Sequence, residues 1–183
     1  MLKSTFTKTV LGLVCLFAVA QPCSALDLSV AGSYFDVEDL DASYGPSVVL
    51  SESIYEEWVD LEFGAGWLMG EEEDVDFSLV PLDLGLKAHL TSGCEFDPYV
   101  RGGATYMSVD EDSDDVELDG DWGAYVGAGV AYPLDSKWDV YTEVLWRWAE
   151  LDANAGGVEY ANAVDANGTQ VNLGVTYSFD SEM

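Results

Sequence analysis

The sequence predicts an all-β fold, an eight-stranded antiparallel up-and-down transmembrane β-barrel. Apolar and polar residues alternate with a period of two along almost the whole chain after residue 25, as in strands with one apolar face. Most alternating segments are close to the roughly 9–11 residues that a tilted strand needs to cross a bilayer. Short turns and longer acidic loops alternate between them, which is the plan of a membrane-spanning barrel.

The composition excludes two broad classes of protein. The 183 residues include 6 Lys+Arg against 35 Asp+Glu, giving a formal net charge of −29. Nucleic acid is therefore not an expected partner, because phosphate binding needs a basic surface. Disorder is also excluded, because 49% of the residues are apolar and disordered chains combine high charge with low hydrophobicity. Acidic and apolar residues must therefore be segregated in the fold.

Residues 1–25 have the features of a cleaved secretory signal. Two early lysines precede the apolar run at 9–20, and the small residues at 23–25 follow it. The run is shorter than the roughly 20 apolar residues of a spanning helix. We therefore expect residues 26–183 to form the mature barrel domain. It would retain a single cysteine, Cys94, which we expect to be an unreactive turn residue.

Each expected strand rests on its own run of alternating apolar residues. The first four are 26–35 (Leu28, Val30, Tyr34), 43–52 (Val48, Leu50), 58–69 (Leu61, Phe63, Trp67) and 75–90 (Leu82, Leu84, Leu86). The last four are 98–109 (Val100, Ala104, Tyr106), 121–134 (Trp122, Val126, Val130), 138–149 (Val140, Val144, Trp146) and 170–179 (Val171, Val175, Tyr177).

The fourth strand changes phase part-way along its length. Val75, Phe77 and Leu79 alternate in one phase, and the leucines after Pro81 alternate in the other. A proline at a one-residue slip predicts a β-bulge at Pro81.

The connections between the expected strands fall into two kinds. The short ones are 53–57, 91–97 and 135–137, and the longer acidic or polar loops are 36–42, 70–74, 110–120 and 152–169. An even number of strands places both chain ends on the side of the short turns, which faces the periplasm in such barrels.

Aromatic residues and glycines indicate that the apolar faces point outward into lipid. Aromatic residues on the apolar faces gather near both strand ends, as in the two girdles of membrane barrels. Glycines lie mostly on the polar faces, as the narrow interior of an eight-stranded barrel requires. A soluble periplasmic barrel with its apolar faces inward is the architectural alternative.

Three segments resemble the outer-membrane β-barrel domain family, in particular its small OmpA/OmpX-like group. They are Leu79–Leu86, Pro98–Gly103 and Tyr125–Val130. The resemblance implies the outer membrane of a Gram-negative-type bacterium, with outer-membrane lipids as partners. The final strand, which ends at Phe179, resembles the aromatic signal read by the barrel-insertion machinery, a further expected partner, although residues 180–183 follow it here.

The polar faces place charges of both signs in the expected lumen. Five residues form the expected ion-pair network: Glu62, Lys87, Arg101, Glu143 and Arg147. An unpaired charge in a narrow interior is costly, so we expect Arg101 or Arg147 to pair with Glu62 or Glu143. The resemblance adds a second reading, in which the pairs exchange to open a small water path.

The third loop offers a weak metal signal. Asp110, Asp112, Asp114 and Asp121 match the spacing of a calcium-binding loop, but Asp115 stands where such a loop needs glycine. We expect at most loose divalent-cation binding at these loops, and no cofactor.

The function expected from the sequence is a structural or surface-interaction role, with acidic loops facing outward. A narrow or gated pore for ions and small solutes is the alternative. A lipid-modifying enzyme is less favoured, because the only histidine, His89, lies at the turn end, away from substrates in the outer leaflet. We therefore name no catalytic residues and expect no enzymatic activity.

Overall fold

The structure is a computed structural model. The structure describes residues 26–37, 42–55, 58–72, 75–90, 95–111, 116–155 and 158–179. The expected signal at 1–25 and the lone Cys94 lie outside the described residues. Among the residues that the structure describes, no helix is long and apolar enough to cross a bilayer.

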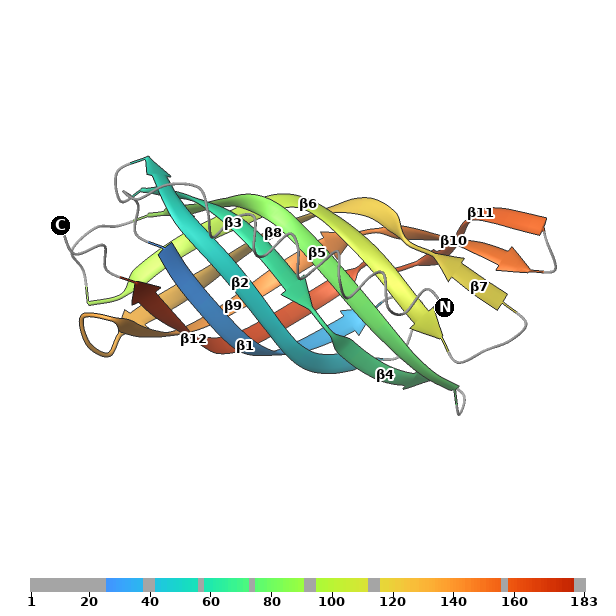
Figure 1. Ribbon diagram of the computed structural model, residues 1–183, viewed down its shortest axis with the longest axis horizontal. Coiled ribbons are helices and arrows are strands. Elements are labelled where there is room, and N and C mark those ends of the chain that lie inside the picture. The colour runs from blue at the N-terminus through green and yellow to red at the C-terminus, as the bar shows by residue number, and fades with distance from the viewer. Residues whose placement is uncertain are drawn as a thin grey trace.

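Antiparallel strands close into one barrel, in which β3 (Val59–Gly66) and β4 (Leu68–Glu72) together occupy one of the eight strand places (Figure 1). The strands of the wall are β1 (Leu26–Val37), β2 (Ser43–Tyr55), β3 continued by β4, β5 (Val75–His89), β6 (Asp97–Glu111), β8 (Asp121–Pro133), β9 (Trp138–Trp148) and β12 (Gly168–Phe179). Each pairs with the next along the chain, and β1 pairs with β12 from Leu26↔Phe179 to Val37↔Gly168. Closure pairs the backbone groups of both terminal strands, as a bilayer requires. The predicted fold class is confirmed.

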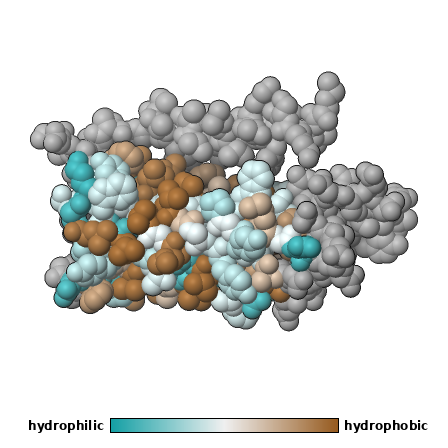
Figure 2. Space-filling view, turned by 90° about the horizontal axis from the view of Figure 1, so that it is seen from below, coloured by the Kyte–Doolittle hydropathy of each residue, from teal (hydrophilic) through white to brown (hydrophobic). Residues whose placement is uncertain are grey.

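The two faces of the wall differ in polarity, and the apolar face points outward. Val30, Val48, Leu84, Val126 and Val144 are all exposed on the outer surface. Figure 2 shows large apolar residues gathered on the outer wall. The buried residues include whole charged side chains, which the interior of a soluble barrel would not hold in place of an apolar core. The soluble alternative is therefore wrong.

Aromatic side chains on the outer face pack together near the strand ends. At the turn end, Trp138 packs on Tyr177 with ring centroids 4.8 Å apart, and Tyr177 packs edge-on against Phe179. At the loop end, Tyr106 packs on Trp122 at 5.4 Å. Such girdles place amphipathic rings at the two membrane interfaces.

The predicted β-bulge at Pro81 is wrong. The β5 strand keeps one register with β6 from Phe77↔Glu111 to His89↔Tyr99. It also pairs with β3 and then β4 without a slip. Phe77 and Leu79 are buried on the same inward face as Asp83. The change of phase in the sequence therefore reflects a lumen that is apolar at one end and polar at the other, rather than a change of register.

The expected loops at 110–120 and 152–169 contain strands that the sequence analysis did not predict. Beyond the barrel, β7 (Val116–Asp119), β10 (Glu150–Ala155) and β11 (Val158–Asp165) form a three-stranded antiparallel sheet (Figure 1). The strand β10 pairs with both β7 and β11. The pairing joins two loops that are far apart in sequence, so the backbone partner of each strand cannot be identified from its own residues.

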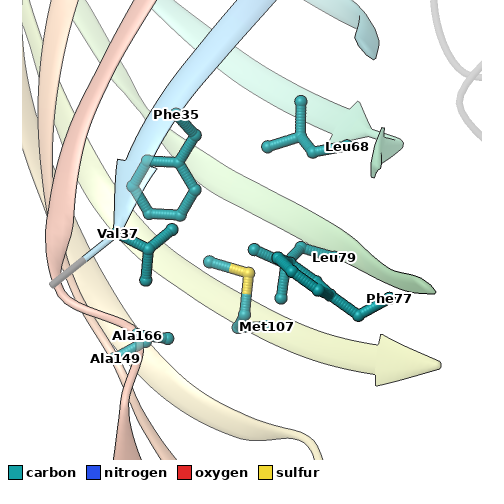
Figure 3. Packing of buried hydrophobic residues seen from close by; sticks show 8 residues of the cluster. All are labelled: Phe35, Val37, Leu68, Phe77, Leu79, Met107, Ala149 and Ala166. Atoms are coloured by element: carbon teal, nitrogen blue, oxygen red, sulfur yellow. The ribbon is translucent and has the colours of Figure 1, made fainter. Parts of the chain in front are cut away.

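An apolar plug fills the loop end of the lumen (Figure 3). Its members are Phe35, Val37, Leu68, Phe77, Leu79, Met107, Ala149 and Ala166. Phe35, Leu68, Leu79 and Met107 are completely buried. Buried apolar side chains offer no hydrogen-bonding partner to water or to a passing ion.

Candidate functional site

The polar part of the lumen, between the turn end and the apolar plug, is the candidate site. At the turn end it opens as a cavity of about 60 Å³, which we call the vestibule. Lys87, His89, Asp97, Tyr99 and Asp139 are among the residues that line it. They come from β5, β6 and β9, whose inward faces alternate with their lipid faces.

Lys87 occupies the level next to the vestibule. Its Nζ is 3.1 Å from Oδ2 of Asp60 and 3.8 Å from Oε1 of Glu62. Both carboxylates project from β3, opposite the β5 strand that holds Lys87. All three side chains are at least 86% buried, so water screens the attraction between their charges only weakly.

Arg101 lies deeper in the lumen, between two carboxylates on different strands. Its Nε is 2.9 Å from Oε2 of Glu62 on β3, and its Nη1 donates to Oε1 of Glu143 on β9 at 3.0 Å. The Tyr99 hydroxyl donates to the other Glu143 oxygen at 3.0 Å. Burial of one guanidinium with two carboxylates is tolerated because each charge faces an opposite one.

Arg147 forms the most complete set of hydrogen bonds in the lumen. Its Nη1 and Nη2 donate to the two oxygens of Asp83, both at 2.7 Å. Its Nε donates to the Gln170 side-chain oxygen at 2.7 Å, and Nη1 also donates to Thr105 at 3.1 Å. The parallel geometry with Asp83 is the strong, bidentate form of an arginine–carboxylate pair.

Neutral polar side chains join the two arginine clusters into one network. Gln170 donates to Asn172 at 2.8 Å, and Asn172 donates to Glu143 at 2.7 Å. The guanidinium groups of Arg101 and Arg147 both lie over the Tyr125 ring, 5.4 and 5.3 Å from its centroid. We call the connected residues the lumen network. Its members are Asp60, Glu62, Asp83, Lys87, Tyr99, Arg101, Thr105, Tyr125, Glu143, Arg147, Gln170 and Asn172.

Inward glycines leave the space that the large lumen side chains need. A Cβ atom at Gly85 would lie 2.2 Å from the Tyr125 hydroxyl oxygen, and one at Gly129 would lie 2.5 Å from the Tyr99 ring. Small and large residues therefore alternate across the narrow interior, as the glycines on the polar faces indicate.

The structure brings together the five charged residues proposed from the sequence, but their partners differ in part. Arg101 contacts both Glu62 and Glu143, whereas Arg147 pairs with Asp83. Sequence reasoning left Asp60 and Asp83 out of the network, although the period-two pattern places both on polar faces. The neutral members could not be predicted from the sequence, because they have no charge that marks them as members. They are Tyr99, Thr105, Tyr125, Gln170 and Asn172.

Little space remains beside the Asp83–Arg147 pair of the lumen network. A second cavity, near Asp83 and Arg147, has about 10 Å³, which is the space of one water molecule. The described residues thus place two barriers in series along the barrel axis: a polar network and an apolar plug.

His89 has carboxylates at both of its ring nitrogens. Nε2 is 2.9 Å from Asp60, and Nδ1 is 2.5 Å from Asp97. Both ring nitrogens are occupied by carboxylates, so the ring is poorly placed to act as a general base.

Replacing His89 with alanine should therefore leave the lipid composition of the outer membrane unchanged. The measurement is mass spectrometry of lipids from cells that express the wild type, His89→Ala or no protein. A lipid species that appears with the wild type and disappears with His89→Ala would contradict this reading.

The candidate calcium positions are not gathered into a metal site by the described residues. Asp110 lies in β6 and Asp121 in β8, while Asp112 and Asp114 lie outside the described residues. Asp121 accepts a hydrogen bond from the backbone N–H of Trp122 at 2.6 Å. Within the described part of the chain, no group of three or more His, Cys, Asp or Glu residues is arranged to hold a metal ion. Loose cation binding at the loops stays a prediction.

The family of the chain follows from its match to a known domain. Residues 11–179 match the family described as the outer membrane protein beta-barrel domain. The chain belongs to this family. It is an integral β-barrel of the Gram-negative outer membrane, as the resemblance of its sequence implied.

Solved outer-membrane barrels share this fold. OprG from Pseudomonas aeruginosa superposes with a TM-score of 0.69 and 15% identity, over 86% of this chain and 96% of OprG. Neisserial surface protein A gives 0.65 and 13%, over 85% and 97% of the two chains. AlkL in lipid bilayers gives 0.63 and 17%, over 86% and 90%. At these identities the likeness extends to the fold alone. No curated protein matches the chain.

Proposed function

We propose that this outer-membrane barrel is a closed structural element of the envelope that presents acidic loops for interactions at the cell surface. The observation that carries the proposal is the filling of the lumen. A continuous network of buried ion pairs is followed by an apolar plug, whose central side chains are completely buried. An eight-stranded barrel is just wide enough for its side chains to fill, so wide porin behaviour is not expected.

The distribution of charge supports a role at the loop end. After residue 25, lysine and arginine occur only at Lys87, Arg101, Lys137 and Arg147. Three of these line the lumen, and Lys137 lies in a turn at the opposite end from the long loops. The loops after β4 and β6 contain runs of Asp and Glu, so the outward field is strongly negative. Such a surface attracts cations and basic partners.

Planar-bilayer recording of the purified mature chain tests the closed state. We expect no stable conductance steps from the wild type, because ions would have to cross both barriers. Unboiled and boiled samples of the same preparation should differ in gel mobility, which shows that the inserted barrel is folded. Long-lived openings of the folded wild type would contradict the proposal.

A gated pore is the second candidate, favoured by the sharing of partners in the network. Arg101 is shared between Glu62 and Glu143, and Lys87 contacts both Asp60 and Glu62, so small rotations could exchange one pair for another. Opening would also require the plug to move. Brief openings that become longer only when Leu79→Ser or Met107→Ser is combined with Arg101→Ser would favour this candidate.

No enzymatic activity is part of the proposal. The solved neighbours are outer-membrane barrels, and the lumen acids described above face cations, hydroxyls or amides rather than an open substrate site.

A further inference from the structure

His89 ties together three strands at the turn end of the lumen. It is the last residue of β5, its Nε2 faces Asp60 on β3, and its Nδ1 faces Asp97 at the start of β6. The histidine side chain is 18% exposed, so solvent screens these contacts only in part. A carboxylate can only accept hydrogen bonds, so both contacts are satisfied only when both ring nitrogens carry a proton.

The charged groups around His89 are mostly acidic. Asp27 on β1 and Asp139 on β9 line the vestibule together with His89 and Asp97. Tyr99 on β6 has its ring centroid 6.4 Å from the histidine ring. Lys87, on the same strand as His89, opposes a second positive charge, but it is itself paired with Asp60 at 3.1 Å.

Loss of one proton from the ring affects the two carboxylates unequally. A neutral ring keeps one N–H, so it can donate to only one of them. The Asp60 side chain is only 9% exposed, so water cannot replace a hydrogen bond that it loses. The Asp97 side chain is 31% exposed, so water can hydrate it when its contact with the ring is broken. The Asp97 contact is therefore the one that is lost.

We propose that His89 is a proton-operated latch at the turn-end mouth of the lumen. With a charged ring, the latch ties the end of β5 to β3 and to the start of β6. With a neutral ring, Asp97 is released and adds an uncompensated negative charge at the mouth of the vestibule. The latch stabilises the fold while the ring is charged. This contribution fades as the pH rises and the ring loses its proton.

The protonation state can be read directly by NMR, because the chain has one histidine. With ¹⁵N-labelled histidine in the folded mature barrel, we expect both ring nitrogens to be protonated at about pH 6. Loss of the proton at higher pH should coincide with changes in the backbone signals of residues 95–99. Asp97→Asn should shift the pH at which the proton is lost. A neutral ring at about pH 6, or an Asp97→Asn variant with an unchanged titration, would overturn the proposal.

Urea unfolding at two pH values tests the contribution to stability. Between about pH 6 and about pH 9, we expect the unfolding constant of the wild type to rise about tenfold more than that of His89→Gln. Asp97→Asn should lose this difference as well, which provides a second variant if His89→Gln folds poorly.

Asp135→Asn is the matched control for the loss of one turn-end carboxylate. Asp135 accepts hydrogen bonds from the backbone of Lys137 and Trp138 in the turn between β8 and β9, whereas the ring of His89 contacts Asp60 and Asp97. The control should keep the pH dependence of the wild type. A His89→Gln barrel with the same pH dependence as the wild type would show that there is no latch.

Discussion

Replacing Arg147 with methionine is expected to lower the free energy of unfolding by about 3–5 kcal/mol, because Asp83 would be left as a buried charge without its partner. Arg147 is 1% exposed and donates to Asp83, Thr105 and Gln170, so all three lose a hydrogen bond at once. Equilibrium urea unfolding of the barrel in detergent or lipid vesicles, followed by tryptophan fluorescence, measures the loss.

A double variant and a surface control separate the charge effect from general damage. Arg147→Met with Asp83→Leu removes both charges, so we expect it to regain much of the stability that the single variant loses. Lys137→Met removes the same charge from an exposed position in a turn, where we expect a cost of about 1 kcal/mol or less. An Arg147→Met barrel as stable as Lys137→Met would show that the network does not depend on this pair.

An arginine on the outer face of the barrel is expected to lower the free energy of unfolding by a similarly large amount. Val126 and Val144 are 49% and 50% exposed on that face, near the middle of β8 and β9. We expect Val126→Arg and Val144→Arg each to cost about 2–4 kcal/mol, because a charge near the middle of the bilayer loses its hydration. The measurement is urea unfolding in lipid vesicles.

A turn residue gives the matched control for this effect. Leu134, 60% exposed, lies in the turn between β8 and β9, so Leu134→Arg should cost only about 0–1 kcal/mol near the interface. If both wall variants insert and unfold like the control, the outer face that contains Val126 and Val144 is not in contact with lipid.

The wall of the barrel could be predicted because its signal is local. In β9, Val140, Val144 and Trp146 alternate with Tyr141, Glu143 and Arg147, and each strand shows its two faces in its own residues. The polarity of the interior was harder to predict. Phe77 and Leu79 looked like lipid-facing residues in a slipped register, although the structure buries them in the plug.

The sequence does not show which charged residues pair with one another in the lumen, because the pairs join residues from distant strands. Arg147 pairs with Asp83, 64 positions away, although Glu143 lies on its own strand. The neutral residues that complete the network, such as Gln170 and Asn172, have no charge to mark them as members.

The sequence by itself determined the all-β class and the two faces of most strands, because apolar and polar residues alternate with a period of two within each strand. The tertiary structure alone decided the contents of the lumen. Closure of β1 onto β12 brings distant inward faces within hydrogen-bonding distance, and the register of all strands together selects which charges meet.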